Sequence, residues 1–251
     1  MHPERASGAA VASRTIQPMR PPVAVMFDLD GTLVDSRGDI VAAMNHALLT
    51  TGRAALTAPA IIRYVGDGAR ALCARCARVS ESSVEVDELL AAFLIYYVEH
   101  PVEFTRWTLG AQETLDALAA MGMPLGICTN KPRVTTEAVL AALGIRTRFR
   151  GVVAGGDIAE KKPAPAPVLH VARQVGVSPD VCVMVGDSPQ DVECARRAGM
   201  RSIAVTNGFS SRERLVDARP DVLLDSLAEV VDVVRRWRDS TARVCVPSRA
   251  R

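Results

Sequence analysis

Apolar runs and amphipathic segments alternate along most of the chain, and this pattern predicts its architecture. From residue 107 onward, each short apolar run typical of a strand is followed by a segment whose apolar positions have helical spacing. The predicted strands are 124–128, 151–154, 181–185, 202–205 and 222–224. The predicted helices are 133–143, 166–175, 190–198, 211–216 and 227–237. Because this alternation is typical of parallel sheets covered on both faces, we predict an α/β fold with a doubly wound (Rossmann-like), mainly parallel sheet that the run 23–27 also joins.

Residues 36–105 interrupt the alternation, since they show helical periodicity and no convincing strand. We therefore predict an all-helical cap domain inserted between strands one and two. The α/β core is then expected over 23–35 and 106–238. Residues 1–22, rich in Ala, Ser, Pro and Arg, are predicted to be a flexible N-terminal arm, and residues 239–251 a loose C-terminal tail.

Composition narrows the class of protein. The chain has 251 residues, 49% of them hydrophobic, and a net charge of +2 that is too small to indicate nucleic acid or an anionic membrane as a partner. We find no apolar run long enough to span a membrane and no secretory signal, which predicts a cytoplasmic protein. The six cysteines, including the pair Cys73 and Cys76, are interpreted as free thiols. No pattern distinguishes a monomer from a dimer.

The first candidate chemistry follows the first predicted strand. Asp28 and Asp30 lie two residues apart there, and Gly31 lets the chain turn sharply after them. Two carboxylates in one short loop repel each other unless a cation joins them. A hard divalent ion such as Mg²⁺, bound by carboxylates and phosphate oxygens, is the natural partner. An EF-hand calcium loop is the alternative, but the preceding buried strand argues against a helix–loop–helix unit.

Polar residues also follow the other strands. Ligands of open α/β sheets bind beyond the carboxyl ends of the strands, so these residues are expected to meet at one site. They are Thr129 and Asn130, Lys161 and Lys162, and the group Asp187, Ser188 and Asp191. Carboxylates, a hydroxyl, an amide and an ammonium together suit a phosphoryl group, whose transfer needs positioning and charge neutralisation.

These residues resemble the four motifs of the haloacid dehalogenase superfamily. The motifs correspond to the strings 28–32, 129–130, 162–163 and 186–191. The longer strings 126–132 and 155–157, and the string 64–68 in the predicted cap, resemble phosphoglycolate phosphatases within that superfamily. The resemblance extends over about residues 23–237, which is nearly all of the chain outside its two ends.

The resemblance implies roles for the acidic residues. Asp28 is expected to be the nucleophile that forms an aspartyl-phosphate, and Asp30 the general acid and then the general base. Mg²⁺ is expected to be held by Asp28, by the backbone carbonyl of Asp30 and by Asp187. Asp191 is expected to assist the metal through water or to orient Lys162, with Ser188 beside it.

The remaining implied roles concern phosphate and the leaving group. Thr129 and the backbone at Asn130 are expected to bind phosphate oxygens, and Lys162 to neutralise the nucleophile and the phosphate. Lys161 and Lys131 are interpreted as surface charges, Lys131 at a helix start.

In the predicted cap, the loop formed by Gly66, Asp67 and Gly68 is expected to help select the substrate. The flanking Arg63 and Arg70 are expected to meet a substrate carboxylate.

We therefore expect a Mg²⁺-dependent phosphomonoester phosphatase whose partner is a small phosphate ester, foremost 2-phosphoglycolate. The alternatives are a phosphatase for pyrophosphate or an amino-sugar phosphate, and a phosphosugar mutase. A phosphonate-cleaving relative needs a lysine in the cap, whereas residues 36–110 contain none. A phospho-acceptor signalling domain is the non-enzymatic alternative, but it has no inserted cap and carries its acceptor acid after strand three.

Overall fold

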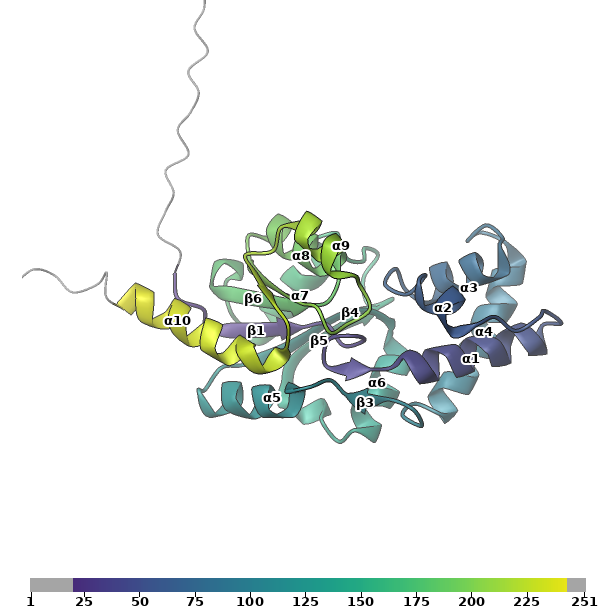
Figure 1. Cartoon of the computed structure of the whole chain (residues 1–251), viewed down its shortest axis with the longest axis horizontal. Coiled ribbons are helices and arrows are strands. Elements are labelled where there is room, and N and C mark those ends of the chain that lie inside the picture. Colours follow the sequence, from purple (N-terminus) through teal and green to yellow (C-terminus); the bar gives the residue numbers. More distant parts are fainter. Residues whose placement is uncertain (1–19, 243–251) are drawn as a thin grey trace, which may run out of the picture.

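The computed structural model describes residues 20–242, and side chains through residue 240. Most of the predicted arm and residues 243–251 of the predicted tail therefore lie outside the described residues. Six parallel strands form one sheet in the order β5-β4-β1-β6-β7-β8 (Figure 1). Their bounds are β1 Ala24–Phe27, β4 Leu125–Pro132, β5 Phe149–Gly155, β6 Cys182–Gly186, β7 Arg201–Val205 and β8 Val222–Leu224. The predicted doubly wound α/β fold is confirmed.

Helices cover both faces of this sheet (Figure 1). On one face lie α7 (Ala166–Val175), α8 (Pro189–Ala198) and α9 (Arg212–Ala218). On the other lie α5 (Ala111–Ala120), α6 (Arg133–Ala142) and α10 (Val230–Ala242). Three 3₁₀ turns complete the core, η1 Arg146–Arg148, η2 Pro179–Val181 and η3 Leu227–Glu229.

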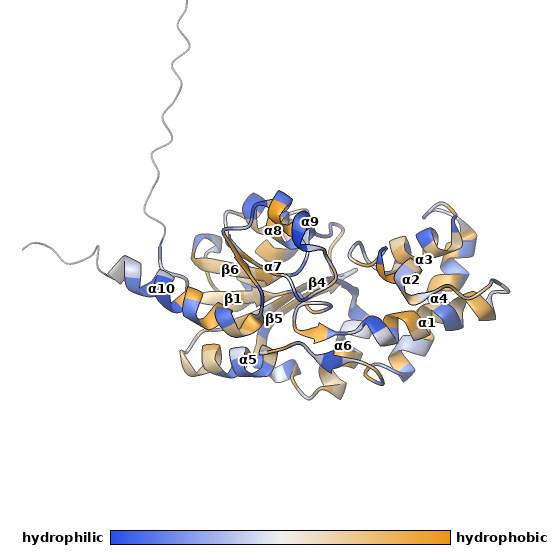
Figure 2. Ribbon diagram, viewed as in Figure 1, coloured by the Kyte–Doolittle hydropathy of each residue, from blue (hydrophilic) through white to orange (hydrophobic). Residues whose placement is uncertain are grey.

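Strand β1 shows why the sheet is buried on both faces. All four of its residues are apolar and fully buried. Because side chains alternate along a strand, Ala24 and Met26 pack into the hydrophobic cluster under α7 and α8, whereas Val25 and Phe27 pack into the cluster on the opposite face. Figure 2 shows the same arrangement as a hydrophobic sheet between helices with polar outer faces. Strand β1 therefore runs through the middle of the hydrophobic core.

Helix α7 shows how the sequence pattern produces a covering helix. Its buried residues Val168, Val171, Ala172 and Val175 recur at helical spacing and form one apolar face against the sheet. Gly176 ends the helix with φ of 81°, a left-handed conformation that glycine adopts at little cost. The predicted and observed bounds of this helix coincide.

The segment between the first two strands of the sheet is helical, as predicted. It contains α1 (Arg37–Thr50), α2 (Ala58–Ile62), α3 (Ala69–Ala77) and α4 (Val84–Glu99), and no strand occurs within residues 36–105. These helices form a group beyond the carboxyl ends of the strands (Figure 1). Helix α4 packs against α1 and α3, and also against α6 of the core. That this group is a separate cap domain stays a prediction.

Some elements differ from the sequence-based prediction. Strand β4 continues to Pro132, four residues past the predicted end, and helix α5 was not predicted. A short antiparallel pair, β2 (Val34–Asp35) and β3 (Arg106–Trp107), joins the chain where it leaves and re-enters the core. Helix α10 continues to Ala242, into the predicted tail.

Two further predictions concern the thiols and the membrane. The five cysteines among the described residues are buried and free, as predicted, and Cys245 lies outside that part of the chain. Between residues 20 and 242, none of the helices combines the length and the apolar character that crossing a membrane requires.

Candidate active site

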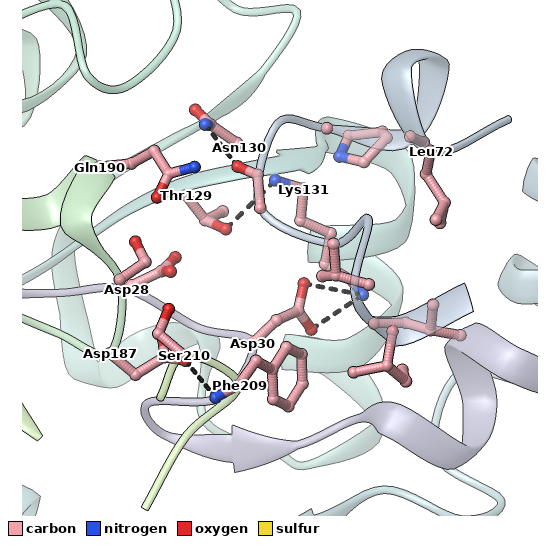
Figure 3. A pocket seen from close by; sticks show the side chains of 18 of the residues that line it. Asp28, Asp30, Leu72, Thr129, Asn130, Lys131, Asp187, Gln190, Phe209 and Ser210 are labelled. Atoms are coloured by element: carbon pink, nitrogen blue, oxygen red, sulfur yellow. Dashed lines mark hydrogen bonds and ion pairs between the residues drawn. The ribbon is translucent and has the colours of Figure 1, made fainter. Parts of the chain in front are cut away.

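The two carboxylates of the first loop point to different partners. Strand β1 ends at Phe27, and the chain turns at Gly31, whose φ is 84°. Asp28 and Asp30 therefore do not share one strand face, and each carboxylate contacts a different lysine (Figure 3 shows both acids beside one pocket). This separation gives two chemically distinct acids within three residues of chain.

Asp28 belongs to a buried ion-pair cluster at the bottom of the site. The Nζ atom of Lys162 lies 3.0 Å from Oδ1 of Asp28 and 2.6 Å from Oδ1 of Asp191. The other oxygen of Asp191 accepts hydrogen bonds from the hydroxyl and the backbone N–H of Ser188, at 2.6 and 3.1 Å. These hydrogen bonds form a capping box at the start of helix α8, which fixes the side chain of Asp191. Asp191 in turn holds the ammonium of Lys162 in place. Of the two adjacent lysines, Lys162 is the one that reaches the acids.

Asp187 follows strand β6 and completes a group of three buried acids. Its oxygens accept hydrogen bonds from the Thr32 hydroxyl at 2.9 Å and from the Phe209 backbone N–H at 2.6 Å. A Cβ atom on Gly31 would lie only 2.3 Å from an oxygen of Asp187, so glycine is required there for the close approach. Asp28, Asp187 and Asp191 each offer an oxygen within 4.8 Å of the others.

This acidic group is electrostatically unbalanced. Burial raises the pKa of Asp28 to about 6, although the nearby Lys162 lowers it. Burial, followed by the charges of Asp28 and Asp191, raises the pKa of Asp187 to about 8. Burial disfavours the charged form of Lys162, yet Asp191 and Asp28 hold its pKa well above its usual value. The ammonium of Lys162 contacts two of the three carboxylates, those of Asp28 and Asp191. A set of hard oxygen donors with excess negative charge fits a divalent cation such as Mg²⁺.

Asp30 has its own set of partners. Its Oδ1 accepts a hydrogen bond from the Ser36 hydroxyl at 2.6 Å, and the Nζ atom of Lys131 lies 3.1 and 3.3 Å from its two oxygens. Lys131 also donates a hydrogen bond of 2.8 Å to the hydroxyl of Tyr97 on helix α4. The side chain of Asp30 thus points away from the three-acid group and toward helix α4.

The interpretation of Lys131 as a surface charge is wrong. Its side chain is only 4% exposed, because strand β4 continues through it and turns it into the pocket beneath Tyr97. Burial opposes its charge, but the neighbouring Asp30 and Tyr97 raise the pKa of Lys131 to about 12, so it remains an ammonium. The sequence holds one signal for this site, since only three of its 30 basic residues are lysines and Lys131 follows Thr129 and Asn130 directly.

Thr129 and Asn130 also lie at the end of β4, where they were expected. The Thr129 hydroxyl accepts a hydrogen bond from the backbone N–H of Lys131 at 3.2 Å. The Asn130 side chain donates to the carbonyl oxygens of Gly66 and Lys162, at 2.9 and 3.0 Å, and accepts from the N–H of Lys162 at 2.9 Å. Asn130 therefore ties the Lys162 loop and the Gly66 loop to the sheet.

One pocket joins these residues to the helical segment. Its lining includes both first-loop acids, Asp187, Ser188, Thr129 to Pro132, Gly66 and Gly68, with apolar side chains of the helical segment such as Leu72 and Phe93 (Figure 3). It also includes Gln190, Phe209 and Ser210, which sequence reasoning did not select because no motif marks them.

The predicted substrate-selecting loop is only partly in this pocket. Gly66 and Gly68 line it, whereas Asp67 is held by Gln190, Arg75 and the Nζ atom of Lys161. Arg70 does not line it, since its guanidinium pairs with Asp87 and with the Glu81 carbonyl. The expectation that Arg70 meets a substrate carboxylate therefore has no support in the geometry. Arg63 lines the pocket, but its side chain is exposed and bonds the Tyr64 hydroxyl at 2.7 Å.

Comparisons with known proteins agree with this architecture. A family model described as haloacid dehalogenase-like hydrolase matches residues 25–205. The chain is 38% identical to a phosphoglycolate phosphatase of Rhodospirillum rubrum over 218 residues, covering 84% of this chain and 90% of the relative. It is 34% identical over 211 residues to a phosphoglycolate phosphatase of Pectobacterium atrosepticum, covering 83% and 90%.

Solved structures extend the likeness to three dimensions. A predicted phosphoglycolate phosphatase from Haemophilus somnus superposes with a TM-score of 0.78 at 30% identity, covering 84% of this chain and 97% of that structure. The family model spans the sheet from β1 to β7 and every acid of the site described above. This chain belongs to the haloacid dehalogenase-like hydrolase family.

Proposed function

We propose that this phosphatase hydrolyses 2-phosphoglycolate by transferring the phosphoryl group to Asp28. The observation that carries the proposal is that the two first-loop acids have different partners. Asp28 contacts Lys162, and Asp30 contacts Lys131. Relatives at 34 and 38% identity are phosphoglycolate phosphatases, which supports the choice of substrate. As the substrate is a small metabolite, we expect the enzyme to act in the cytoplasm.

In this mechanism Asp28 attacks phosphorus, and the ester oxygen of the leaving group departs. The ammonium of Lys162, held in place by Asp191, reduces the repulsion between the Asp28 carboxylate and the phosphate group as they approach each other. Thr129 and the backbone at Asn130, both within β4, bind phosphate oxygens in this mechanism. Asp28 then carries the phosphoryl group as an acyl phosphate until water hydrolyses it.

Asp30 serves the leaving group and the water. In the first step its carboxylic acid donates a proton to the departing alkoxide oxygen, and in the second the carboxylate takes a proton from the attacking water. The hydroxyl of Ser36 and the ammonium of Lys131 orient this side chain. Because Asp28 and Asp30 have different surroundings, the same residue type performs nucleophilic and acid–base roles.

We assign Mg²⁺ to the three-acid group, with Asp28, Asp187 and the backbone carbonyl of Asp30 as its protein ligands. Asp191 is close enough to this group to assist, though its contact with Lys162 makes positioning of that lysine its main role. When bound, the ion shields the negative charges that converge there and stabilises the charge that develops in transfer.

A panel of phosphate esters tests the substrate. We expect kcat/KM for 2-phosphoglycolate to exceed that for pyrophosphate, an amino-sugar phosphate and hexose phosphates by roughly tenfold or more. A pocket that recognises a polar group of its substrate discriminates by at least that factor against esters that lack the group. The assay measures steady-state phosphate release by purified protein. Equal rates on every ester would contradict the substrate, and interconversion of sugar phosphates without phosphate release would indicate a mutase.

We further propose that helices α1 to α4 act as a cap whose Gly66–Gly68 loop closes over the bound substrate. Gly66 and Gly68 have φ of 128° and 90°, and a Cβ on Gly68 would lie 3.2 Å from the Asn130 carbonyl oxygen. Replacing both residues with Val should lower kcat for 2-phosphoglycolate by about tenfold or more, because valine does not adopt these angles without strain.

The matched control for this loop is Gly52→Val. Gly52 also lies in the helical segment and has a positive φ, and a Cβ atom added to it would meet nothing within 4 Å. It carries a similar backbone strain away from the pocket, so its kcat should stay close to that of the wild type. Unchanged kinetics in the Gly66 and Gly68 double variant would refute the role of the loop.

A further inference from the structure

We infer that Lys131 is the specificity residue that binds the carboxylate of the leaving group, and that Tyr97 positions it. This inference rests on the proposed function, because it starts from a substrate whose leaving group carries its own negative charge. The roles assigned above use Lys131 only to orient Asp30. Its burial and its place in the pocket indicate more.

The position of Lys131 relative to Asp30 carries the first step. As general acid, Asp30 must come within hydrogen-bonding distance of the ester oxygen. In 2-phosphoglycolate a single methylene separates that oxygen from the carboxylate. The Nζ atom of Lys131 lies 3.1 and 3.3 Å from the Asp30 oxygens, so an ester oxygen at Asp30 brings the substrate carboxylate next to this ammonium.

The second step is the contrast with Lys162. Lys162 contacts Asp28 and Asp191, which places its charge at the phosphoryl end of the site. Lys131 contacts Asp30 and Tyr97 instead, on the side of helix α4. An anionic ester has two charged ends, and the site holds one buried ammonium for each.

The third step compares the cations that line the pocket. Among the described lining residues these are Arg63, Lys131 and Arg214. Arg63 and Arg214 are exposed, whereas the Lys131 side chain is 4% exposed. A charge interaction is stronger where water is excluded, and exposed pairs contribute little. Lys131 is therefore the cation that discriminates most between a charged and a neutral leaving group.

Tyr97 fixes the ammonium in place. Its hydroxyl accepts a hydrogen bond of 2.8 Å from Lys131, whose Nζ also lies 4.0 Å from the centre of its ring. Tyr97 itself is 1% exposed and packs against Phe93 in helix α4. An ammonium has three N–H donors, and its described partners are one carboxylate and one hydroxyl. The longer of its two contacts with Asp30 can be exchanged for an oxygen of the substrate carboxylate.

A pair of esters isolates this interaction. We would measure kcat/KM for 2-phosphoglycolate and for 2-hydroxyethyl phosphate, which has a neutral hydroxymethyl group in place of the carboxylate. Lys131→Met should lower the ratio of the two values on the order of 100-fold, as expected when one partner of a buried charge pair is removed. Lys131→Arg should recover part of the ratio, because it restores the charge. A loss of Asp30 positioning alone lowers both values equally and leaves the ratio unchanged, which would overturn the inference.

Two further variants keep the test decisive. Tyr97→Phe retains the ring and loses the hydroxyl, so it should fold and lower the ratio by roughly threefold to tenfold. Arg63→Met removes an exposed cation from the same pocket and should leave the ratio near the wild-type value. A ratio that falls in Arg63→Met but not in the Lys131 and Tyr97 variants would transfer the role to Arg63. A wild-type enzyme without preference for 2-phosphoglycolate would contradict the proposed substrate, whereas a wild-type preference that survives Lys131→Met contradicts the Lys131 assignment alone.

Discussion

Replacing Asp28 with Asn should lower kcat by about 10⁴-fold or more, because the amide removes the nucleophile of the proposed reaction. The side chain keeps its size, and Lys162 keeps its contact with Asp191. Burial raises the pKa of Asp28 to about 6, which means that the folded protein disfavours the ionised form. The metal-free variant should therefore melt at a temperature no lower than that of the wild type at neutral pH.

The matched control is Asp180→Asn, the same chemical change at an exposed residue that pairs with Arg20 far from the pocket. It should leave kcat and KM unchanged. Phosphate release would be measured for both variants under saturating substrate, together with circular dichroism to confirm folding. Retention of more than about a tenth of wild-type kcat in Asp28→Asn would exclude this acid as the nucleophile.

Removing divalent metal should lower turnover by about 10³-fold or more, and adding Mg²⁺ should restore it. The reason lies in the three-acid group, where the ammonium of Lys162 contacts two of the buried acids, Asp28 and Asp191, whereas Asp187 accepts hydrogen bonds from neutral donors. The assay compares phosphate release in EDTA with release after Mg²⁺ is returned in excess. Full activity in EDTA would contradict the assignment of the metal.

The same group predicts how the stability of the metal-free protein depends on pH. The pKa of Asp187 is raised from 3.8 to about 8 in the folded state, and that of Asp28 to about 6. Between pH 4 and 8 the folded state then binds more protons than the unfolded state, so the free energy of unfolding falls as pH rises through this window.

Because Mg²⁺ binds the ionised acids, it should reverse this trend. Thermal melts in EDTA should give a Tm about 5 °C or more lower at pH 8 than at pH 5, and saturating Mg²⁺ should raise the value at pH 8. The Asp187→Asn variant in EDTA should lose most of the dependence above pH 6. A Tm that rises with pH in EDTA would mean that these acids are stabilised by other means.

The order of strands and helices could be predicted because the apolar pattern is strong where both faces of the sheet are buried. Helix α7 coincides with its prediction, since four buried residues at helical spacing and Gly176 mark its face and its end. Strands β2 and β3 have only two residues each, which is too short for any periodicity. Helix α5 contains a regular apolar face of Leu115 and Leu118 that its alanines obscure.

The candidate site was harder to predict from the sequence than the fold, because contacts between distant segments determine where its side chains lie. The motifs located Asp28, Lys162 and Asp187, which the topology of the parallel sheet brings together. Lys131 was misplaced because its burial depends on helix α4, which lies about 35 residues earlier in the chain, and on the continuation of β4. Arg70 was expected in the pocket, but an ion pair with Asp87, which the sequence pattern does not reveal, holds its side chain outside.

The two lysines that serve the first-loop acids are supplied by different parts of the chain. Lys162 comes from the loop after β5, and Lys131 from β4 beneath a tyrosine of helix α4. Positions 97 and 131 can consequently be exchanged without touching the contacts of Lys162 with Asp28 and Asp191, although a substitution at 131 also removes a contact that orients Asp30. Under the role proposed for Lys131, libraries randomised at those two positions should therefore yield catalysts that accept uncharged alcohols.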